Sequence, residues 1–324
     1  CSSDLGASSP GPAGRGAAAA LGPGLLVALL VLLSRLPFLG HGYGADPDAW
    51  RAISASQDLV DTGRYVPSRV PGYPLPEYVD ALMIHLGAGS SWGIGLLSAL
   101  LSGAAAALFF HLLVPLGRAR AVAGTLAMSF TPVVYVAGLG AMDYLWGLTF
   151  FLAATVCMRS NRVWPAAFFL GLAAASRPSY ALGIIPLALL YADFDVRRFR
   201  RPEVLRQLAV LALASGLIAL AFFLPAFLNV GVRSPERYGD WKYLAYNSTL
   251  GLFGVIGLVG VGCAVVSAWR NRRGGVPLTA PLGQRLDAWA VTVLAVFGLL
   301  FVWLPDEASY LIPALPGLYW LLCR

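Results

Sequence analysis

Charged residues are scarce in this sequence of 324 residues. They make up 12% of it, whereas soluble domains carry roughly 25%, and this shortage excludes an ordinary soluble globular protein. Apolar residues reach 58%. Several apolar runs have the roughly 17 to 25 residues that a helix needs to cross a hydrocarbon core about 30 Å thick. The sequence therefore predicts a polytopic membrane protein.

Cysteine, histidine and lysine are also rare, and each shortage argues against a class of function. Three of the four cysteines (Cys157, Cys263 and Cys323) lie in apolar runs, where cysteine packs as a small hydrophobe rather than in a disulfide framework. The three histidines lack any metal-ligand spacing. Lys242 is the single lysine, so the net charge of +7 comes from arginines. These arginines lie mainly between the apolar segments, where they orient a membrane protein, and we therefore expect no nucleic-acid partner.

The ends of the chain are typical of a fragment. Residues 1–5 read CSSDL, which matches the translation of a common sequencing-adaptor tail, and we expect them to be an artefact. No initiating methionine is present, and the last apolar run stops at Arg324. We expect a disordered cytoplasmic lead over residues 1–20, one transmembrane domain over residues 21–324, and truncation at the C-terminus.

The apolar runs predict an all-α bundle of about ten spans. A long first outer loop, about residues 40–90, follows the first span, and its segments 46–61 and 77–86 are expected to form helices on the membrane surface. The expected spans are residues 21–39, 92–114, 121–137, 144–158, 163–175, 180–191, 208–230, 250–269, 288–304 and 310–323.

The arginines predict the orientation of these spans. With the N-terminus in the cytoplasm, 15 of the 23 basic residues lie inside, while 11 of the 16 acidic residues lie outside. The inner basic residues are Arg15, Arg118, Arg120, Arg159, Arg162, Arg197, Arg198, Arg200, Arg201, Arg206, Arg270, Arg272, Arg273, Arg285 and Arg324.

This orientation brings charged residues from five places in the sequence to the outer face. Charged side chains beside apolar spans are costly and tend to mark function, so their convergence predicts a site at that face. The residues are Asp46, Asp48, Glu77, Asp143, Arg177, Asp306 and Glu307.

Asp46 and Asp48 follow directly on the first span, which should place their carboxylates at the lipid–water boundary. A carboxylate there could take a proton from an acceptor hydroxyl while a lipid-linked donor rests in the outer leaflet. The alternative is that one of the two merely caps the N-terminus of the surface helix.

Four motifs in sequence resemble the GT-C superfamily of integral-membrane glycosyltransferases. They are an acid after the first span, SRVPGYPLPE in the first loop, GLAAASRPSYALGIIP, and PDEASYLIPALPGL. The resemblance covers most of the chain and implies inverting transfer of a sugar from a polyprenyl-phosphate carrier. It also implies that Asp48, in the string DAWRA, is the catalytic base, with Asp46 as the second candidate.

The remaining candidates are outer-face residues, each with a structural alternative. Arg69 and Arg177 could hold the lipid phosphate, because guanidinium matches phosphate oxygens, or could snorkel to the interface. Glu77 could position the acceptor or begin the second surface helix. Asp143 opens a span, where an acid favours the helix dipole. Glu307 and Tyr310 border the last span, and Tyr310 could belong to an aromatic belt.

The string DPD at residues 46–48 is similar to the DxD of some metal-dependent glycosyltransferases. Two carboxylates would suit Mg or Mn, so a divalent cation is a possible cofactor, although a two-aspartate string is common.

The sequence supports two main functions. The first is a glycosyltransferase of a bacterial inner membrane, using a polyprenyl-phosphate sugar and an envelope glycan, lipid or protein acceptor at the non-cytoplasmic face. The second is a transporter or lipid flippase, but the midspan regions carry almost no charge and no internal repeat is visible, unlike transporters. A third possibility is a membrane scaffold whose outer acids only contact water.

Overall fold

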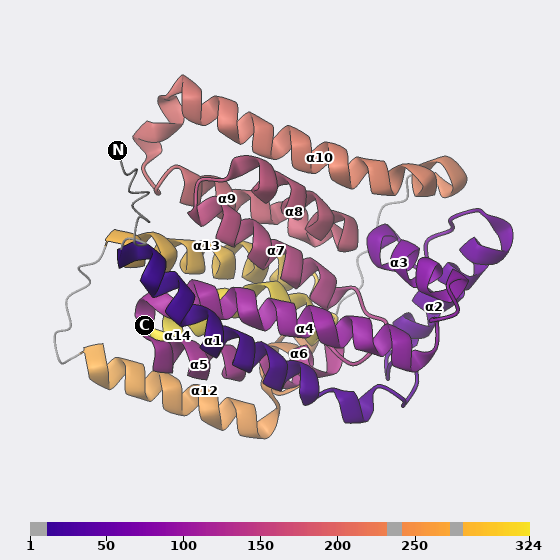
Figure 1. Ribbon diagram of the computed structural model, residues 1–324, viewed down its shortest axis with the longest axis horizontal. Helices are drawn as coiled ribbons and strands as arrows, with labels where there is room; N and C mark the ends of the chain where they lie inside the picture. Colours follow the sequence, from indigo (N-terminus) through magenta and orange to yellow (C-terminus); the bar gives the residue numbers. More distant parts are fainter. Residues whose placement is uncertain (1–11, 232–241, 273–280) are drawn as a thin grey trace, which may run out of the picture.

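The computed structural model describes residues 12–231, 242–272 and 281–324, and the regular structure in these ranges is helical (Figure 1). The chain is a polytopic helical bundle, as predicted. Its α-helices are α1 (Pro12–Leu33), α2 (Pro47–Thr62), α3 (Pro74–His85), α4 (Ser91–Leu113), α5 (Arg118–Ser129), α6 (Pro132–Ala137), α7 (Tyr144–Arg159), α8 (Val163–Ser176), α9 (Ile184–Tyr191), α10 (Pro202–Val230), α11 (Lys242–Ser248), α12 (Leu250–Arg272), α13 (Pro281–Trp303) and α14 (Leu315–Cys323).

Short 3-10 helices connect several of these elements. They are η1 (Leu36–Phe38), η2 (Val114–Leu116), η3 (Pro178–Gly183), η4 (Val196–Arg200) and η5 (Ala308–Ala314). By length and composition, four helical segments can cross a membrane: Ser91–Leu116, Pro202–Val230, Leu250–Ser267 and Gln284–Trp303. Five shorter apolar segments accompany them, at Gly22–Phe38, Tyr144–Arg159, Val163–Ser176, Pro178–Tyr191 and Ala308–Cys323.

Two predicted elements differ from the observed ones. The lead expected to be disordered over residues 1–20 is helical from Pro12 onward, because its run of alanines favours helix; residues 1–11, which include the suspected artefact, lie outside the described ranges. The span expected over residues 121–137 is broken between α5 and α6. Pro132 occupies the first position of α6, where its missing N–H costs nothing, whereas inside a helix it would remove a hydrogen bond.

The centre of the bundle is α7, whose apolar side chains are buried on nearly every side. Phe151 packs against Tyr180 of η3 and against Trp289 and Phe297 of α13. On the neighbouring helix α8, a Cβ on Gly171 would lie 2.7 Å from Ile218. The absence of a side chain there lets α8 and α10 approach closely, as small residues do in membrane bundles.

The far side of α10 carries the lipid-facing surface of this part of the bundle. Its leucines recur every three or four residues and are exposed, as expected for a helix stripe that contacts hydrocarbon rather than protein. They are Leu213, Leu217, Leu220, Leu224 and Leu228.

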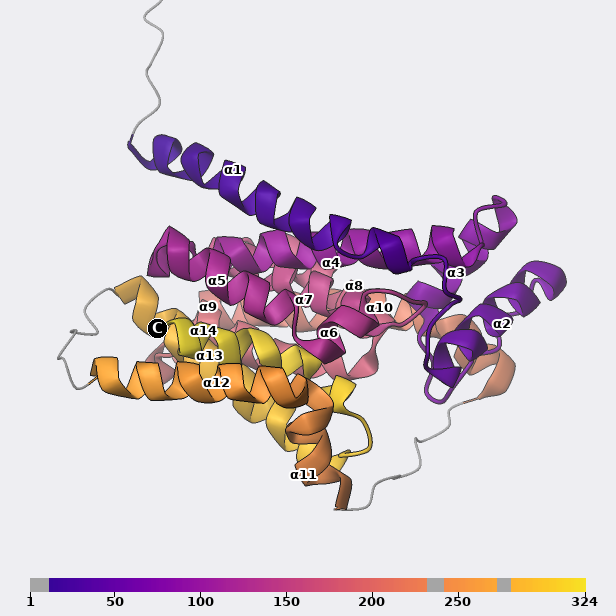
Figure 2. The same cartoon turned by 90° about the horizontal axis from the view of Figure 1, so that it is seen from below.

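The two ends of the bundle differ in what they carry (Figures 1 and 2). Helices α2 and α3 project at one end, and the first residues of α1 and the C-terminus lie at the other. Both helices of the first loop were predicted, although α3 starts at Pro74 rather than at residue 77. Proline is well suited to the first turn of a helix, and the first turn of α3 has two.

Candidate functional site

Close contact between two loops places the candidate site at the α2–α3 end. The main-chain N–H of Ala141 donates to the carbonyl of Tyr43 at 2.7 Å, and Ser98 of α4 donates to the carbonyl of Gly140 at 2.6 Å. A Cβ on Gly140 would lie 2.2 Å from the Tyr43 carbonyl oxygen, so glycine is needed there. The start of α2 is thereby held beside the start of α7.

Asp46 and Asp48 have different roles at the start of α2. Asp46 is the N-cap residue, and its Oδ1 accepts a hydrogen bond from the main-chain N–H of Asp48 at 2.9 Å. The Asp48 side chain instead contacts two arginines, with Oδ1 2.8 Å from Nη1 of Arg51 and Oδ2 2.5 Å from Nη1 of Arg69. The capping alternative therefore describes Asp46, and Asp48 is the acid that faces other charged groups.

Asp143 joins two arginines inside the same cluster. Its Oδ1 lies 2.8 Å from Nη2 of Arg69, and its Oδ2 lies 2.5 Å from Nη1 of Arg177. Only 2% of the Asp143 side chain is exposed, and it makes no capping hydrogen bond to α7, so the helix dipole does not account for its contacts. The result is a continuous chain of ion pairs, Asp48–Arg69–Asp143–Arg177, drawn from α2, the loop before α3, the start of α7 and the end of α8.

Arg69 is the central cation of this chain and remains charged. Burial lowers the pKa of its guanidinium, but Asp143, Tyr73 and Asp48 together raise it above its ordinary value. Its Nε is buried and has no hydrogen-bond partner among the described residues. An unpaired buried donor is costly, and the described residues supply no acceptor for this N–H.

Tyrosine rings surround both arginines. Tyr73 lies between them, with its ring centre 4.2 Å from Cζ of Arg69 and 5.4 Å from Cζ of Arg177. The rings of Tyr144 and Tyr310 lie 4.1 Å and 4.7 Å from Arg177. Aromatic faces attract a desolvated cation, so the rings stabilise the guanidinium groups without consuming their N–H donors.

Glu307 connects the loop before α14 to this cluster. Tyr144 donates its hydroxyl to Glu307, and Ser309 does so at 2.9 Å. Asn247 of α11 fixes the same loop by donating to the carbonyls of residues 305 and 306, both at 2.8 Å. Tyr144 thus contacts both Glu307 and Arg177, and the last segment of the bundle becomes part of the site.

Glu77 lies behind the cluster and holds the loop that carries Arg69. It accepts hydrogen bonds from Tyr65 at 2.6 Å and from Ser68 at 2.5 Å, and only 1% of it is exposed. Burial raises the pKa of Glu77 to about 7, although these hydrogen bonds and the charge of Arg69 lower it in part. Asp80, one turn later, has a pKa raised to about 7 by burial and by the charge of Glu77.

Most of the residues singled out from the sequence therefore meet. Asp46 and Glu77 support the cluster through a helix cap and a loop contact, respectively. The connected residues are Asp48, Arg69, Asp143, Arg177, Glu307 and Tyr310.

Sequence reasoning missed Tyr73 and Tyr144. A tyrosine near the end of a span is typical of the aromatic belt, so neither stood out. Their positions in the sequence did contain a signal, since Tyr73 belongs to the motif SRVPGYPLPE and Tyr144 directly follows Asp143.

The two acids of the DPD string contact protein groups in this structure. Both Asp48 oxygens contact arginines, and Asp46 caps its own helix. Within the described ranges, no three His, Cys, Asp or Glu side chains gather as a metal-ligand set. The two carboxylates of DPD contact different partners in this structure, and the participation of a divalent cation stays a prediction.

Comparison with solved structures provides an independent view of the fold. The crystal structure of ArnT from Cupriavidus metallidurans bound to undecaprenyl phosphate superposes on 93% of this chain with a TM-score of 0.59 and 20% sequence identity. The chain has the fold of ArnT. The GT-C resemblance stated from the sequence motifs is thereby confirmed for the fold.

The chain spans 58% of the length of that ArnT chain. No family model matches the sequence, and no curated protein does. The likeness to ArnT shows the fold of this chain, and its chemistry depends on its own residues.

Proposed function

We propose that this chain is a membrane glycosyltransferase that moves a sugar from a polyprenyl-phosphate carrier to an acceptor at the non-cytoplasmic face of a bacterial inner membrane. The observation that carries the proposal is the chain of ion pairs Asp48–Arg69–Asp143–Arg177 at one end of the bundle, partly buried at Asp48 and Arg69 and buried at Asp143 and Arg177. Support comes from the fold, since ArnT was solved with undecaprenyl phosphate bound. The acceptor class is an envelope glycan, lipid or protein.

Arg69 and Arg177 are the groups suited to the donor phosphate. Each carries N–H donors beyond those that contact Asp143, and Nε of Arg69 has no partner among the described residues. Guanidinium groups bind phosphate oxygens through paired, charge-assisted hydrogen bonds. They would orient the donor and neutralise the charge that grows on the phosphate as it leaves.

Asp48 is the group suited to act as general base. In the resting arrangement its oxygens are bonded to Arg51 and Arg69. A donor phosphate that bonds to Arg69 would release one Asp48 oxygen beside the donor. That oxygen takes the proton of the acceptor hydroxyl as the acceptor oxygen bonds to the anomeric carbon. The bond from that carbon to the phosphate oxygen breaks with its electron pair, which gives polyprenyl phosphate and an inverted product.

The position of the charged cluster favours this enzyme over a transporter or lipid flippase. Transporters place their polar binding groups near the middle of the bilayer, often in interrupted helices related by internal repeats. Here the connected acids and arginines lie in the first loop and at the ends of α7 and α8, beside the projecting α2 and α3. A scaffold would have no need for buried, interconnected charges.

The test is a transfer assay with a labelled polyprenyl-phosphate sugar on purified variants. Asp48→Asn should lower the transfer rate by about 100- to 10,000-fold, the usual contribution of a general base. Asp58→Asn, an exposed acid on the same helix, is the matched control and should keep the normal rate. Asp46→Asn should retain most activity, because asparagine also caps helices well.

Each variant needs thermal unfolding equal to that of the parent before its rate is interpreted. Near-normal transfer by Asp48→Asn would contradict the assignment of the base. A rate that depends on added Mg or Mn and disappears with a chelator would show that a divalent cation takes part, and would require a ligand set other than the one seen between Asp46 and Asp48.

A further inference from the structure

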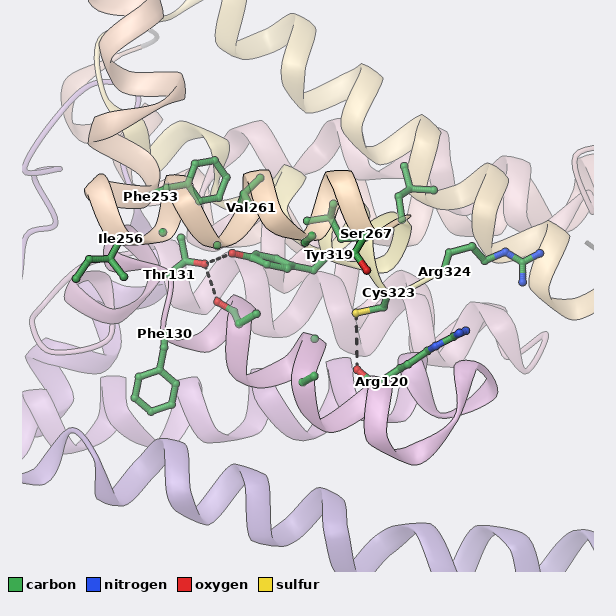
Figure 3. Close-up of a pocket in the computed structure, with 18 of the residues that line it drawn as sticks. Arg120, Phe130, Thr131, Phe253, Ile256, Val261, Ser267, Tyr319, Cys323 and Arg324 are labelled. Atoms are coloured by element: carbon green, nitrogen blue, oxygen red, sulfur yellow. Dashed lines mark hydrogen bonds between the residues drawn. The ribbon is translucent and has the colours of Figure 1, made fainter. Parts of the chain in front are cut away.

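A second site lies along the lipid-facing side of the bundle, between α5, α12 and α14. It is a cavity of about 1810 Å³, larger than the roughly 300–1,000 Å³ of common small-molecule pockets. Most of its lining is apolar, from Phe130, Phe253 and Ile256 at one end to Val261 near the middle (Figure 3). A long, apolar occupant fits this shape.

Weak packing of α12 creates this cavity. Only 11% of its membrane segment is buried, compared with 56% for the segment that contains α4. Gly254 has a left-handed backbone (φ 62°) that interrupts the helix, a conformation that suits glycine. Along the same wall, Gly257 and Gly260 add no side-chain bulk, so the space between α12 and α5 stays open.

Arginines gather at one end of the cavity. Arg120 belongs to the first turn of α5 and Arg270 to the last turns of α12, so the opposite directions of the two helices bring both to the same end. Arg324 also lies there (Figure 3), but Asp287 balances its charge at 2.8 Å. Neither Arg120 nor Arg270 has an ion-pair partner among residues 12–231, 242–272 and 281–324, which leaves an excess of positive charge.

We propose that this cavity binds an anionic phospholipid, with its acyl chains between α5 and α12 and its phosphate between Arg120 and Arg270. The arginine distribution assigns this end of the bundle to the cytoplasm, where anionic lipids concentrate, and basic pockets between spans are known to receive their headgroups. The arginine end of the cavity lies at the end of the bundle opposite to Asp48, so the phosphate proposed here is separate from that of the proposed donor.

The contribution of the two arginines is tested by titrating the purified chain in detergent with lipid. Native mass spectrometry counts the bound lipid and gives the affinity. Arg120→Gln/Arg270→Gln should lower the affinity for phosphatidylglycerol about 25-fold, since one basic residue near an anionic lipid contributes roughly fivefold. Arg118→Gln/Arg206→Gln removes two exposed arginines from the same end but outside the cavity, and should leave the affinity unchanged. Equal losses in both double variants would overturn the proposal.

Shape is tested by filling the cavity. Gly260→Leu places a side chain into it, and the new Cβ meets no described atom within 4 Å. Gly262→Leu is the matched control, because Gly262 is equally unobstructed but does not line the cavity. Only Gly260→Leu should reduce lipid binding.

Two further ligands separate the possible occupants. Phosphatidylcholine, which has no net charge, should bind far more weakly than phosphatidylglycerol. Undecaprenyl phosphate should not displace bound phosphatidylglycerol; efficient displacement would overturn the proposal and assign the cavity to the polyprenyl carrier. Equal binding of the two phospholipids would also overturn it, because the arginines would then play no part.

Discussion

The two ends of the bundle use arginine in different ways. At the α2–α3 end, Arg69 and Arg177 are enclosed by acids and tyrosine rings, with 14% and 6% of their side chains exposed. At the opposite end, Arg198 and Arg285 share Asp193, and all three remain about a third exposed. Exposed pairs contribute about 0–1 kcal/mol and suit a role in orienting the spans. Burying charges costs several kcal/mol per ion, so the enclosed cluster needs another explanation, and function provides one.

The two ends of the bundle should face different compartments. Each end is therefore either accessible from outside the cell or not. In a chain without its native cysteines, Asp61→Cys of α2 should react with an impermeant thiol reagent on intact cells. Glu203→Cys, at the start of α10, should react only after the membrane is permeabilised. Both positions are exposed, so accessibility in the protein is matched. Equal reaction on intact cells would reverse or remove the assigned orientation.

The next largest effect should come from breaking the enclosed cluster. Asp143→Ala leaves Arg69 and Arg177 without their shared partner and should lower the free energy of unfolding by about 3–5 kcal/mol, the usual result for half of a buried ion pair. Denaturant unfolding in detergent micelles measures this. The double variant Asp143→Ala/Arg177→Met should recover part of the loss, since it removes the uncompensated charge.

Asp193→Ala is the matched change at the opposite end. Because its arginines keep contact with water, it should cost no more than about 1 kcal/mol. A loss as large as that of Asp143→Ala would erase the distinction between the two ends.

Glu77 should make stability depend on pH. Its pKa of about 7 lies above the roughly 4.3 of an unfolded glutamate, so between these values the folded state keeps a proton that the unfolded state has lost. The free energy of unfolding should therefore fall as pH rises from about 4.3 to 7, by on the order of 3 kcal/mol for this group. Asp80 acts in the same direction.

Unfolding measured from pH 5 to pH 8 tests this dependence. Glu77→Gln should remove part of the slope, and Glu77→Gln/Asp80→Asn nearly all of it. A parent protein whose stability does not fall over this range would show that Glu77 is already ionised when folded, because both states would then have lost its proton.

The smallest effect should come from Asp46. Asp46→Ala removes the N-cap of α2 and should destabilise the protein by about 1 kcal/mol. Asp46→Asn should cost less than this, because its side chain can accept the same hydrogen bond from the main chain of Asp48. Thermal unfolding of the two variants tests the role of Asp46 as a cap. If Asp46 were instead a catalytic acid, the alanine and asparagine variants would lose activity equally in the transfer assay.

The outline of the fold could be predicted because it depends on apolar length and arginine position. Both surface helices and most spans follow from these patterns. The break at Pro132 was missed because the apolar run continues through it, although a proline inside a span is itself a warning. The first residues of α1 and α3 also differ from the predicted ones. Helix propensity extends α1 and proline at the first turn extends α3 beyond what the apolar pattern indicates.

The site could be predicted only as a set of residues on one face. Sequence spacing cannot show that Asp143 bridges Arg69 and Arg177, because those contacts cross from α7 to the first loop and to α8. Sequence spacing also could not show that Asp46 caps α2 while Asp48 contacts arginines, and the choice of Asp48 as base stays a prediction. Tyr73 and Tyr144 were hidden by their resemblance to ordinary interfacial aromatics.

The loop that carries Arg69 has a consequence for how the protein matures. Asp143 and Arg177 belong to the bundle, whereas Asp48 and Arg69 arrive with the polar segment between α1 and α4. The helices of the bundle supply only half of the cluster, and the segment between α1 and α4 has to dock on them to complete it. A newly inserted chain would have its helices in place yet lack Asp48 and Arg69 at the cluster until that segment docks, so the activity proposed here would begin only at that step.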